Sequence, residues 1–389
     1  MASESELFLP ILALPRTMLV RGAGSYVWDD HGKRYLDFTS GIAVLALGHS
    51  HPAVTQVIAE QAATLVHCSN LYVTEPVVRL AEMLKTASFA HRLWFTNSGT
   101  ESIEAALKFV RLHGHTQRVS KKKIIAFKGG FHGRTTGAVS ITYQPAYREP
   151  FGELLSDVLF AEFNQLETVA ALMDDDVCAI FVEPIQGEGG VHVATHEFLQ
   201  GLRALCDRHD ALLVFDEIQC GMGRTGKMFA YEHSGVIPDL MALAKPLAGG
   251  LPLGAILANE KVSRLLKPGF HGSTFAGGPL TTAVGCKVFE LISTPEFLAN
   301  VQSHGQYLEE GLQAIASRGS SFMDQRGLGL MRALVIRDPE KLTPASVVQL
   351  AAERGLLLTR AGNDAVRILP PLNCTREEID EALAILETM

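Results

Sequence analysis

The chain has 389 residues, which is enough for two domains and for a large buried core. Apolar residues make up 47% of it and the formal net charge is −8, so the composition fits a compact enzyme and argues against a nucleic-acid-binding surface. No apolar run approaches the roughly 20 residues that a membrane-spanning helix needs, so no membrane partner is expected.

The predicted elements divide the chain into three stretches. Residues 1–50 contain YVWDDHGKRYLDF, two β-rich runs around a turn, which predicts a hairpin. Between residues 51 and 289 strand-like and helix-like segments alternate, which is typical of an α/β fold with a mainly parallel sheet covered by helices. Residues 290–389 change to a long helix, three strands and a final helix, which indicates a smaller α+β domain.

The alternation in the middle stretch can be followed in the sequence itself. Strands are predicted at RLWFT, KIIAF, DVLFAEF, VCAIFVEP, ALLVFDE, LMALA and GAILANE. Helices are predicted at ESIEAALKFVRLHG, HEFLQGLRALCDRHD and LTTAVGCKVFELI. The run Lys121–Lys123 before KIIAF is interpreted as a solvated start of that strand.

The cysteines and the first residues bear on the compartment. Six cysteines without any CxxC pair predict reduced, mostly buried thiols. The first segment, MASESELFLPILALPR, is typical of neither a secretory signal nor a transit peptide. A cytoplasmic location is therefore predicted, or the mitochondrial matrix if a transit peptide has been removed.

Two apolar strands end in residues of opposite charge. The strand of ALLVFDE ends at Asp216, and 29 residues later Lys245 follows the strand of LMALA. Ligands of open α/β sheets bind beyond the carboxyl ends of the strands, so this acid and this amine are expected to face one ligand. The pair suits pyridoxal 5′-phosphate (PLP), because a lysine can bind its aldehyde covalently and an acid can keep its ring nitrogen protonated.

A phosphate site is predicted where the strand RLWFT meets the helix that follows. Ser98, Gly99 and Thr100 combine small hydroxyl side chains with a glycine and expose backbone N–H groups at a helix N-terminus, where phosphate binds. An ordinary helix cap is the alternative. Beside Asp216 and Lys245, the phosphate interpretation is preferred.

The loop Gly129–Arg134 follows the strand KIIAF. Phe131, flanked by glycines, can lie flat on a planar cofactor, and Arg134 can clamp a carboxylate with two parallel hydrogen bonds. A turn with a packed phenylalanine and a surface arginine is the alternative, and the sequence of this loop does not decide between them.

Two further glycine-rich loops carry candidate residues. Glu183 follows the strand VCAIFV and could support the cofactor, while Glu188 could pair reversibly with a substrate-binding arginine; solvated acids are the alternative. The loop His271–Pro279 could supply hydroxyl groups to a phosphate, or it could form only the turn before the next helix.

Two other kinds of site are not expected. The segment Gly221–Lys227 satisfies GxGxxG, but Met228 stands where a phosphate-binding loop needs Ser or Thr to hold magnesium. No spacing of His and Cys predicts a metal site. His49, His51 and His132 are interpreted as hydrogen-bonding loop residues, not metal ligands.

Seven motifs, in order, resemble the class III aminotransferases of the fold-type-I PLP superfamily over nearly the whole chain. They are NSGTE, FHGRT, EPIQGEGGV, FDEIQCGMGRTGK, LAKPLAGGLPLGA, HGSTFAGGPL and RILPPLN. The resemblance implies a large PLP-binding domain at 51–289 and a small domain built from 1–50 and 290–389. It also implies a homodimer with active sites at the interface.

The resemblance assigns a role to each candidate. Lys245 would bind PLP and move a proton between substrate and cofactor, and Asp216 would bind the ring nitrogen. Arg134 would bind the α-carboxylate of an acylated amino acid. Arg367 would bind that of glutamate or 2-oxoglutarate, and Glu188 would cover Arg367 when the other substrate is bound. The other implied cofactor-binding residues are Ser98, Gly99, Thr100, Phe131, His132, Glu183, Gln219 (at the phenolic oxygen) and Thr274 (reaching a neighbouring subunit's site), and Ser273 is a further substrate-binding candidate.

The motifs are similar to those of family members that act on N2-acetylornithine. This implies ping-pong amino transfer from N2-acetylornithine to 2-oxoglutarate, as in arginine biosynthesis. Ornithine, 4-aminobutyrate and N-succinyl-diaminopimelate stay open as alternative donors, and a non-catalytic binding protein is disfavoured because Lys245 and Asp216 are both present. Leu45, Ile103 and Pro246 depart from the usual family pattern without removing a catalytic group.

Overall fold

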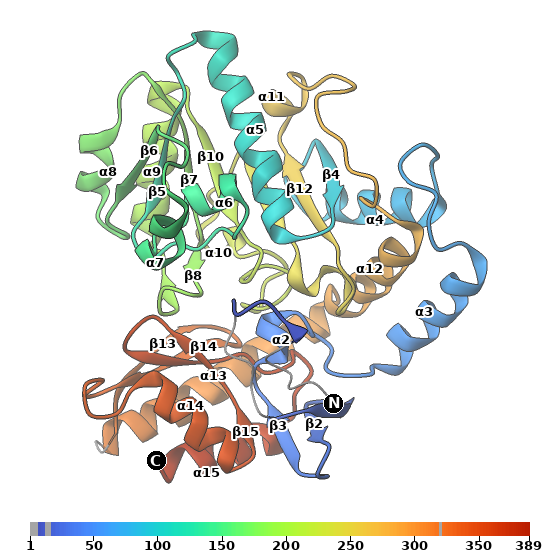
Figure 1. Cartoon of the computed structure of the whole chain (residues 1–389), viewed down its shortest axis with the longest axis vertical. Helices are drawn as coiled ribbons and strands as arrows, with labels where there is room; N and C mark the ends of the chain where they lie inside the picture. Colours follow the sequence, from blue (N-terminus) through green and yellow to red (C-terminus); the bar gives the residue numbers. More distant parts are fainter. Residues whose placement is uncertain (1–6, 12–16, 319–320) are drawn as a thin grey trace.

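The computed structural model describes residues 7–11, 17–318 and 321–389. Most of the N-terminal segment considered above as a targeting signal lies outside these residues. Figure 1 shows an upper lobe around a large sheet and a lower lobe in which early and late segments of the chain lie together.

A seven-stranded sheet, in the order β4-β12-β11-β10-β7-β5-β6, forms the upper lobe. Strands β7, β10 and β11 are parallel, as are β5 and β6, whereas β12 runs antiparallel to β11 and β4. The predicted mainly parallel sheet is therefore confirmed. The strands are β4 (Arg92–Thr96), β5 (Lys123–Phe127), β6 (Val158–Ala161), β7 (Val177–Val182), β10 (Leu212–Asp216), β11 (Leu240–Leu243) and β12 (Gly254–Ala258).

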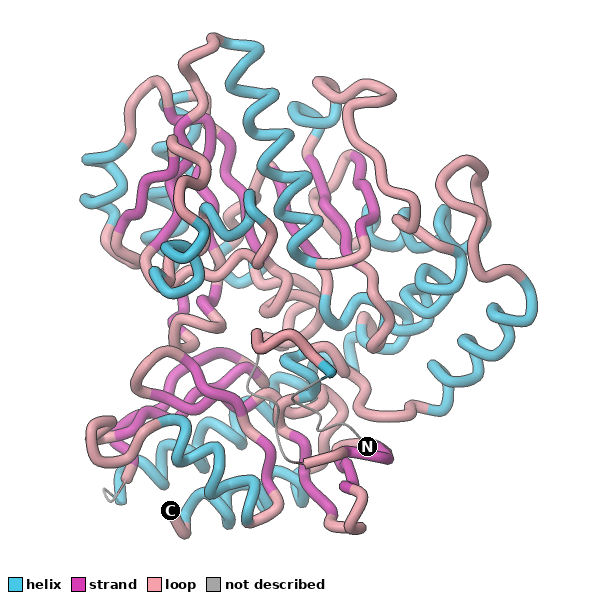
Figure 2. The backbone as a smooth tube through the Cα atoms, viewed as in Figure 1, coloured by secondary structure: helices cyan, strands magenta, loops and turns pink. Residues whose placement is uncertain are grey.

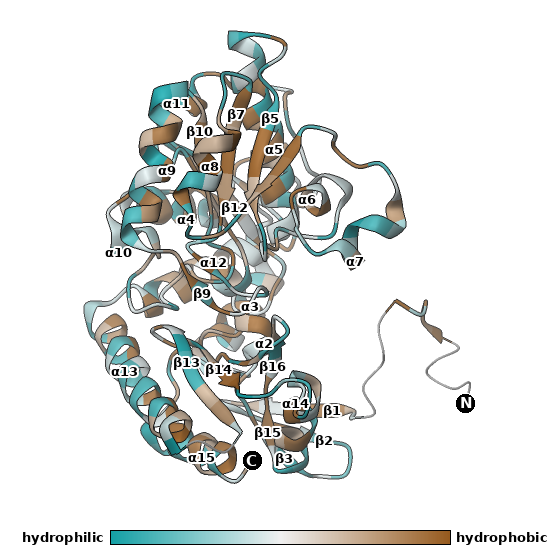
Figure 3. Ribbon diagram, turned by 90° about the vertical axis from the view of Figure 1, so that its left-hand side faces the viewer, coloured by the Kyte–Doolittle hydropathy of each residue, from teal (hydrophilic) through white to brown (hydrophobic). Residues whose placement is uncertain are grey.

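Helices cover both faces of this sheet (Figure 2). Successive residues of each central strand point to opposite sides, so an apolar strand gives the sheet two apolar faces that helices bury. Ile124 and Val214 pack in a core with α5, whereas their neighbours Ile125 and Leu213 pack in a core with α9. The strands β5 and β7 are accordingly hydrophobic along their length (Figure 3). The main helices are α3 (Pro52–Thr64), α4 (Glu75–Thr86), α5 (Gly99–Gln117), α9 (His196–His209) and α12 (Pro279–Ile292).

Short elements complete the two lobes and the loops between them. They are α2 (Ser40–Ala43), α6 (Thr136–Ser140), α7 (Pro145–Arg148), η1 (Glu149–Phe151), α8 (Leu166–Leu172), β8 (Ile185–Gln186), β9 (His192–Val193), α10 (Tyr231–Ser234), η2 (Lys245–Ala248) and α11 (Glu260–Ser263).

The lower lobe combines both ends of the described chain. The predicted hairpin is confirmed, since β2 pairs antiparallel with β3, and β15 adds parallel to β3. Leu36 and Phe38 share one buried core with Val301 and Ile379. The boundaries of the two domains, between 50 and 51 and between 289 and 290, stay predictions. The elements are β1 (Leu19–Ala23), β2 (Tyr26–Asp29), β3 (Arg34–Asp37), α13 (Pro295–Arg318), β13 (Phe322–Leu328), β14 (Met331–Ile336), α14 (Pro344–Glu353), β15 (Leu356–Leu357), β16 (Thr359–Ala361), β17 (Ala365–Ile368) and α15 (Arg376–Glu387).

The glycine-rich loop Gly221–Lys227 connects the two lobes. Arg224 within it is fully buried and donates from Nη1 to the carbonyl oxygens of Leu330 and Pro370. The next helix, α10, has only four residues and begins at Tyr231. The loop therefore lacks the helix N-terminus that a phosphate-binding loop requires.

One interpretation of the sequence is wrong at Lys121. Its side chain is buried, and Nζ donates to the carbonyl oxygen of His209 at 2.7 Å. Only Lys122 and Lys123 form ion pairs nearer the surface, with Asp157 and Asp174. A lysine stem can cross apolar surface to reach a backbone carbonyl, which a run of charges does not reveal.

All six cysteines are free thiols and five of them are buried, as predicted. Over the part of the chain that the structure describes, no helix is long and apolar enough to cross a membrane. The same residues contain no group of three or more His, Cys, Asp or Glu side chains placed to hold a metal ion.

Candidate active site

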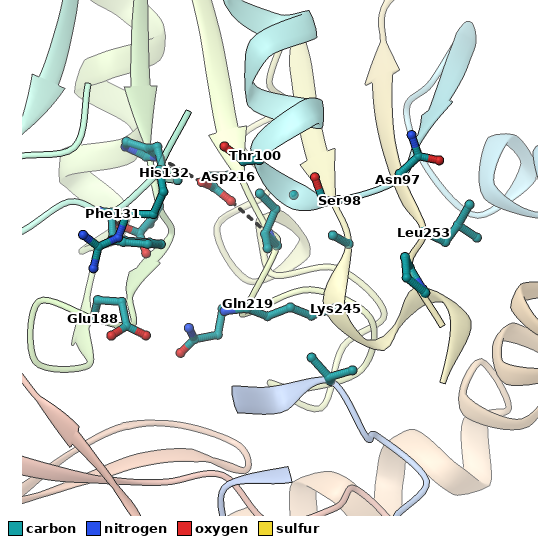
Figure 4. A pocket seen from close by; sticks show the side chains of 18 of the residues that line it. Asn97, Ser98, Thr100, Phe131, His132, Glu188, Asp216, Gln219, Lys245 and Leu253 are labelled. Carbon is teal, nitrogen blue, oxygen red and sulfur yellow. Dashed lines mark hydrogen bonds and ion pairs between the residues drawn. The ribbon is translucent and has the colours of Figure 1, made fainter. Parts of the chain in front are cut away.

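A cavity of 470 Å³ lies at the edge of the large sheet where the parallel strands end (Figure 4). The segments that follow β4, β5, β7, β10 and β11 all contribute to its wall, as expected for an α/β sheet. Eleven residues predicted from the sequence meet there: Ser98, Gly99, Thr100, Phe131, His132, Arg134, Glu183, Glu188, Asp216, Gln219 and Lys245.

Lys245 is the second residue after β11 and adopts a left-handed backbone conformation, with φ of 40°. Burial and, to a smaller extent, the positive charge of Arg367 lower the pKa of its amine to about 8, against the opposing effect of Glu188 and Asp216. A lysine with such a pKa is partly neutral near physiological pH, and the neutral amine is the nucleophilic form.

This pKa predicts the pH dependence of PLP uptake by the cofactor-free protein. Only the free amine attacks an aldehyde, so the rate should rise with pH and reach half its maximum near pH 8 instead of near the usual 10.5. Replacing Arg367 with glutamine removes a cation that lowers this pKa, so the half-maximum should move to higher pH. Initial rates of the absorbance change across the pH range measure both, and a wild-type midpoint near 10.5 would contradict the prediction.

Asp216 is held by two hydrogen bonds at the end of β10. Its Oδ2 accepts from His132 Nδ1 at 2.8 Å, and its Oδ1 accepts from the backbone N–H of Ile218 at 3.0 Å. Burial lowers the pKa of His132, but the hydrogen bond and the charge of Asp216 outweigh it and raise that pKa overall. The carboxylate is thereby oriented, and the imidazole of His132 compensates part of its charge.

Glu183 connects the loops that follow β5 and β7. Its Oε1 accepts from the N–H of Phe131 at 2.8 Å and its Oε2 from that of Gly187 at 3.2 Å. Burial raises the pKa of Glu183 to about 7. The carboxyl group thus fixes the backbone that carries Phe131, as a supporting role would require.

The N-terminus of α5 points its first turn at the same cavity. Ser98 caps the helix by accepting from the N–H of Glu101, and Thr100 bonds through its hydroxyl to Thr135 at 2.9 Å. A Cβ atom on Gly99 would lie 2.8 Å from Ile218 Cδ1, so a larger residue would displace that side chain. The exposed N–H groups and the helix dipole form a site suited to a phosphate.

Arg367 forms one cluster with two other predicted residues, Glu188 and Gln219. Its side chain is 1% exposed, and Nη1 donates to Glu188 Oε1 at 2.6 Å and to Gln219 Oε1 at 3.0 Å. Nε donates to Thr359 Oγ1 at 3.1 Å. Because the Glu188 side chain is 35% exposed, it can leave the arginine by moving into solvent.

Arg134 is positioned by aromatic rings. Its guanidinium carbon lies 3.3 Å from the centroid of the Tyr147 ring and 5.6 Å from that of Phe131. Cation–π attraction holds the group at the wall while leaving its N–H donors free for an anion. Tyr147 was not predicted from the sequence. An aromatic residue that follows the loop of Arg134 by so few positions could have suggested a cation–π contact with that arginine.

Ser273 and Thr274 do not line this cavity. Ser273 lies behind its wall, where its Oγ accepts from Nδ2 of the lining residue Asn97 at 3.0 Å, and Thr274 is exposed. The role of Thr274 in a neighbouring subunit's site stays a prediction. Cavity residues that the sequence did not indicate include Val44, Asn97, Ile218 and the segment 250–253.

The departures from the family pattern are accommodated locally. Leu45 packs against Gly250, and Ile103 is fully buried in the core under α5. Ser102, which precedes Ile103, bonds to the hydroxyl of Thr96 and to the carbonyl oxygen of Leu243. A polar contact between α5 and β11 is therefore present.

These residues fit PLP on four separate grounds. The cavity offers an amine of lowered pKa, a fixed carboxylate, an aromatic side chain and the N-terminus of a 19-residue helix. The model for the family Aminotransferase class-III matches residues 13–389, and the chain belongs to this family. Its members depend on PLP, so the protein is a PLP-dependent aminotransferase of fold type I.

Among its relatives, succinylornithine transaminase from Citrobacter koseri is 47% identical over 379 residues, 97% of this chain and 93% of that protein. The crystal structure of N-acetylornithine aminotransferase from Stenotrophomonas maltophilia K279a is 39% identical with a TM-score of 0.85, covering 96% of this chain and 95% of that one. Ornithine aminotransferase from Toxoplasma gondii ME49 is 30% identical with a TM-score of 0.93, covering 98% and 92%.

Proposed function

We propose that the protein transfers the terminal amino group of N2-acetylornithine to 2-oxoglutarate, giving N-acetylglutamate 5-semialdehyde and glutamate, as a step of arginine biosynthesis. The observation that carries the proposal is the pair of arginines at the cavity. The guanidinium group of Arg134 packs against aromatic rings, and its N–H donors are free to bind a carboxylate. Arg367, in contrast, is covered by Glu188. The relatives named for N-acetylornithine and succinylornithine support a donor of the N2-acylornithine type.

The two arginines suit the two substrates of the exchange. While Glu188 covers Arg367, only Arg134 of the two is available to bind a carboxylate. This suits a donor such as N2-acetylornithine, which has one carboxylate, and that carboxylate is far from the reacting amine. When Glu188 moves away, a second arginine can bind a substrate with carboxylates at both ends, such as 2-oxoglutarate. The acylated nitrogen of the donor is neutral and needs no acidic partner.

PLP, when bound, withdraws electrons and makes a proton on the carbon beside the reacting nitrogen acidic. Lys245 Nζ would accept that proton and return it. Asp216, oriented by His132, would hold the ring nitrogen, and the first turn of α5 would bind the phosphate. Apolar lining residues such as Ile218 and Leu253 would exclude water from the reacting atoms.

The test is a single-turnover comparison of donors with the PLP-loaded protein. N2-acetylornithine, ornithine and 4-aminobutyrate are mixed separately with the enzyme, and conversion of its absorbance is followed without 2-oxoglutarate. We expect N2-acetylornithine to react at least about tenfold faster than the others, since each 1.4 kcal/mol of differential binding is a factor of ten. Faster reaction of free ornithine would refute the proposed donor.

We also propose a homodimer, and an exposed apolar surface supports it. Leu71, Tyr72 and Val73 are 79%, 73% and 82% exposed, and Phe275 is 67% exposed. Asn70 Nδ2 donates to the carbonyl oxygen of Ser273 at 2.8 Å, so these two loops adjoin. Large exposed apolar surfaces mark interfaces between proteins.

The dimer can be tested by placing a charge on that surface. Tyr72→Asp should convert the protein to monomers in sedimentation velocity and reduce turnover, because Thr274 would no longer reach a second site. Val119→Asp, at a residue 77% exposed on another part of the chain, serves as the control. A wild-type monomer with full activity at nanomolar concentration would contradict the proposal.

A further inference from the structure

A second cavity, of 740 Å³, adjoins the first at the Glu188–Arg367 ion pair. Both cavities are lined by Phe131 and Glu188. On one side the second cavity is bounded by the segments that follow β5, and on the other by α14, β16 and the turn after β16. It therefore lies between the two lobes, directly beyond the site assigned to the substrate.

The wall of this cavity depends on a close approach of three backbone segments. A Cβ atom on Gly189 would lie 2.3 Å from the carbonyl oxygen of Gly129. Gly362 has φ of 60°, and its N–H donates to the carbonyl oxygen of Glu188 at 2.8 Å. A side chain at Gly189 would force the segments of Gly129 and Gly189 apart, so this wall of the cavity depends on glycine.

Among the charged residues that line this cavity, in the part of the chain that the structure describes, one arginine has no acidic partner in the lining. Glu188 and Arg367 neutralise each other at 2.6 Å. Arg360, on β16, is the remaining charged residue of the lining. Asp364, four positions further along the chain, is engaged by Arg326 at 2.9 Å. The second cavity thus has a surplus positive charge on the side opposite Tyr147.

Arg134 stands where the two cavities meet. It lines the first cavity, and its guanidinium lies 3.3 Å from the ring of Tyr147, which lines the second. If the α-carboxylate of a donor binds Arg134, the adjacent acylated nitrogen lies at this junction. The δ-amine then extends into the first cavity toward Lys245, and the acyl group extends into the second.

We propose that the second cavity receives the acyl group of the donor and that Arg360 binds a carboxylate at its far end. An acetyl group has no such carboxylate, whereas a succinyl group does. Donors acylated by a dicarboxylic acid are therefore bound more tightly than N2-acetylornithine, an inference that rests on the proposed function. The 47% identity to a succinylornithine transaminase is consistent with it.

Binding of unreactive analogues tests the inference directly. N2-succinylnorvaline and N2-acetylnorvaline lack the δ-amine, so calorimetry on the PLP-loaded enzyme measures binding without turnover. We expect the succinyl compound to bind about fivefold more tightly, because an ion pair with an exposed arginine is worth up to about 1 kcal/mol. Arg360→Gln should abolish this difference, and Arg360→Lys should keep part of it.

Kinetics with the two acylornithines supply the second measurement. Arg360→Gln should lower kcat/KM about fivefold for N2-succinylornithine, through KM, and change that for N2-acetylornithine less than twofold. Arg264→Gln, an exposed arginine paired with Glu260 on α11, is the matched control and should change neither. High salt should weaken the succinyl preference of the wild type in the same way.

The outcomes separate this inference from the proposed function. If both acylornithines react well and Arg360→Gln alters them equally or not at all, the acyl subsite is wrong and the proposed function stands. If free ornithine reacts faster than either acylornithine, the proposed function fails, and the acyl subsite fails with it. A loss confined to the succinyl substrate supports both.

Discussion

Replacing Lys245 with alanine is expected to reduce kcat by about 10⁴-fold or more, because one change removes both the covalent attachment of PLP and the proton carrier. PLP can still bind through the N-terminus of α5 and Asp216, so the variant should retain cofactor but lose the absorbance of the lysine-linked form. Turnover with saturating PLP and donor, together with the absorption spectrum, measures the two effects.

Lys227→Ala is the matched control for this experiment. Lys227 is an exposed lysine in the loop after β10 and does not line the cavity. Its removal should leave kcat and the spectrum unchanged. A Lys245→Ala variant that kept more than about 1% of wild-type turnover would contradict the role of general base and nucleophile assigned to this amine.

Arg367→Gln should separate the two half-reactions. The arginine is almost fully buried, and loss of one partner of a buried charged pair costs 2–5 kcal/mol, so kcat/KM for 2-oxoglutarate should fall about 10²- to 10³-fold. The half-reaction with N2-acetylornithine should slow by less than about tenfold, because that donor uses Arg134. Single-turnover rates measured separately with donor and acceptor give both numbers.

Glu188→Gln changes the other partner of this ion pair. A neutral amide binds Arg367 more weakly than a carboxylate does, so Arg367 is uncovered more easily, and glutamate should compete better with N2-acetylornithine for the PLP-loaded enzyme. Arg337→Gln, at an exposed arginine outside both cavities, is the control for general effects. Equal losses in both half-reactions of Arg367→Gln would show that the arginine supports the structure and does not select the acceptor.

Much of the upper lobe could be predicted because its strands are buried on both faces. Every residue of β7, β10 and β11 is buried, which produces short apolar runs that alternate with amphipathic helices. Asp216 and Lys245 were predicted on the same basis. Asp216 is the last residue of β10, and Lys245 follows the neighbouring parallel strand β11. Asp216 is paired with Ala242 of β11.

Other features depend on contacts that no local pattern carries. The antiparallel direction of β12, which follows β11 after the connection 244–253, is one of them, because a strand pattern does not show direction. β13 was not predicted, because three consecutive polar residues interrupt its sequence FMDQRGL and only its first residue is buried. The environment of Arg367 was implied only by the family resemblance. The second cavity is lined by segments from both lobes. Neither feature could be derived from the spacing of residues in the sequence.

The lower lobe has a consequence for synthesis of the protein on the ribosome. β3 pairs with β15, and the N–H of Leu369 donates to the carbonyl oxygen of Phe38. The early residues of this lobe therefore cannot form these contacts until residues more than 300 positions later have been synthesised. The large sheet and Lys245 are complete long before β17 emerges. Since domains fold as units in order of synthesis, a nascent chain should be able to acquire PLP before it possesses Arg367, the residue assigned to choosing the acceptor.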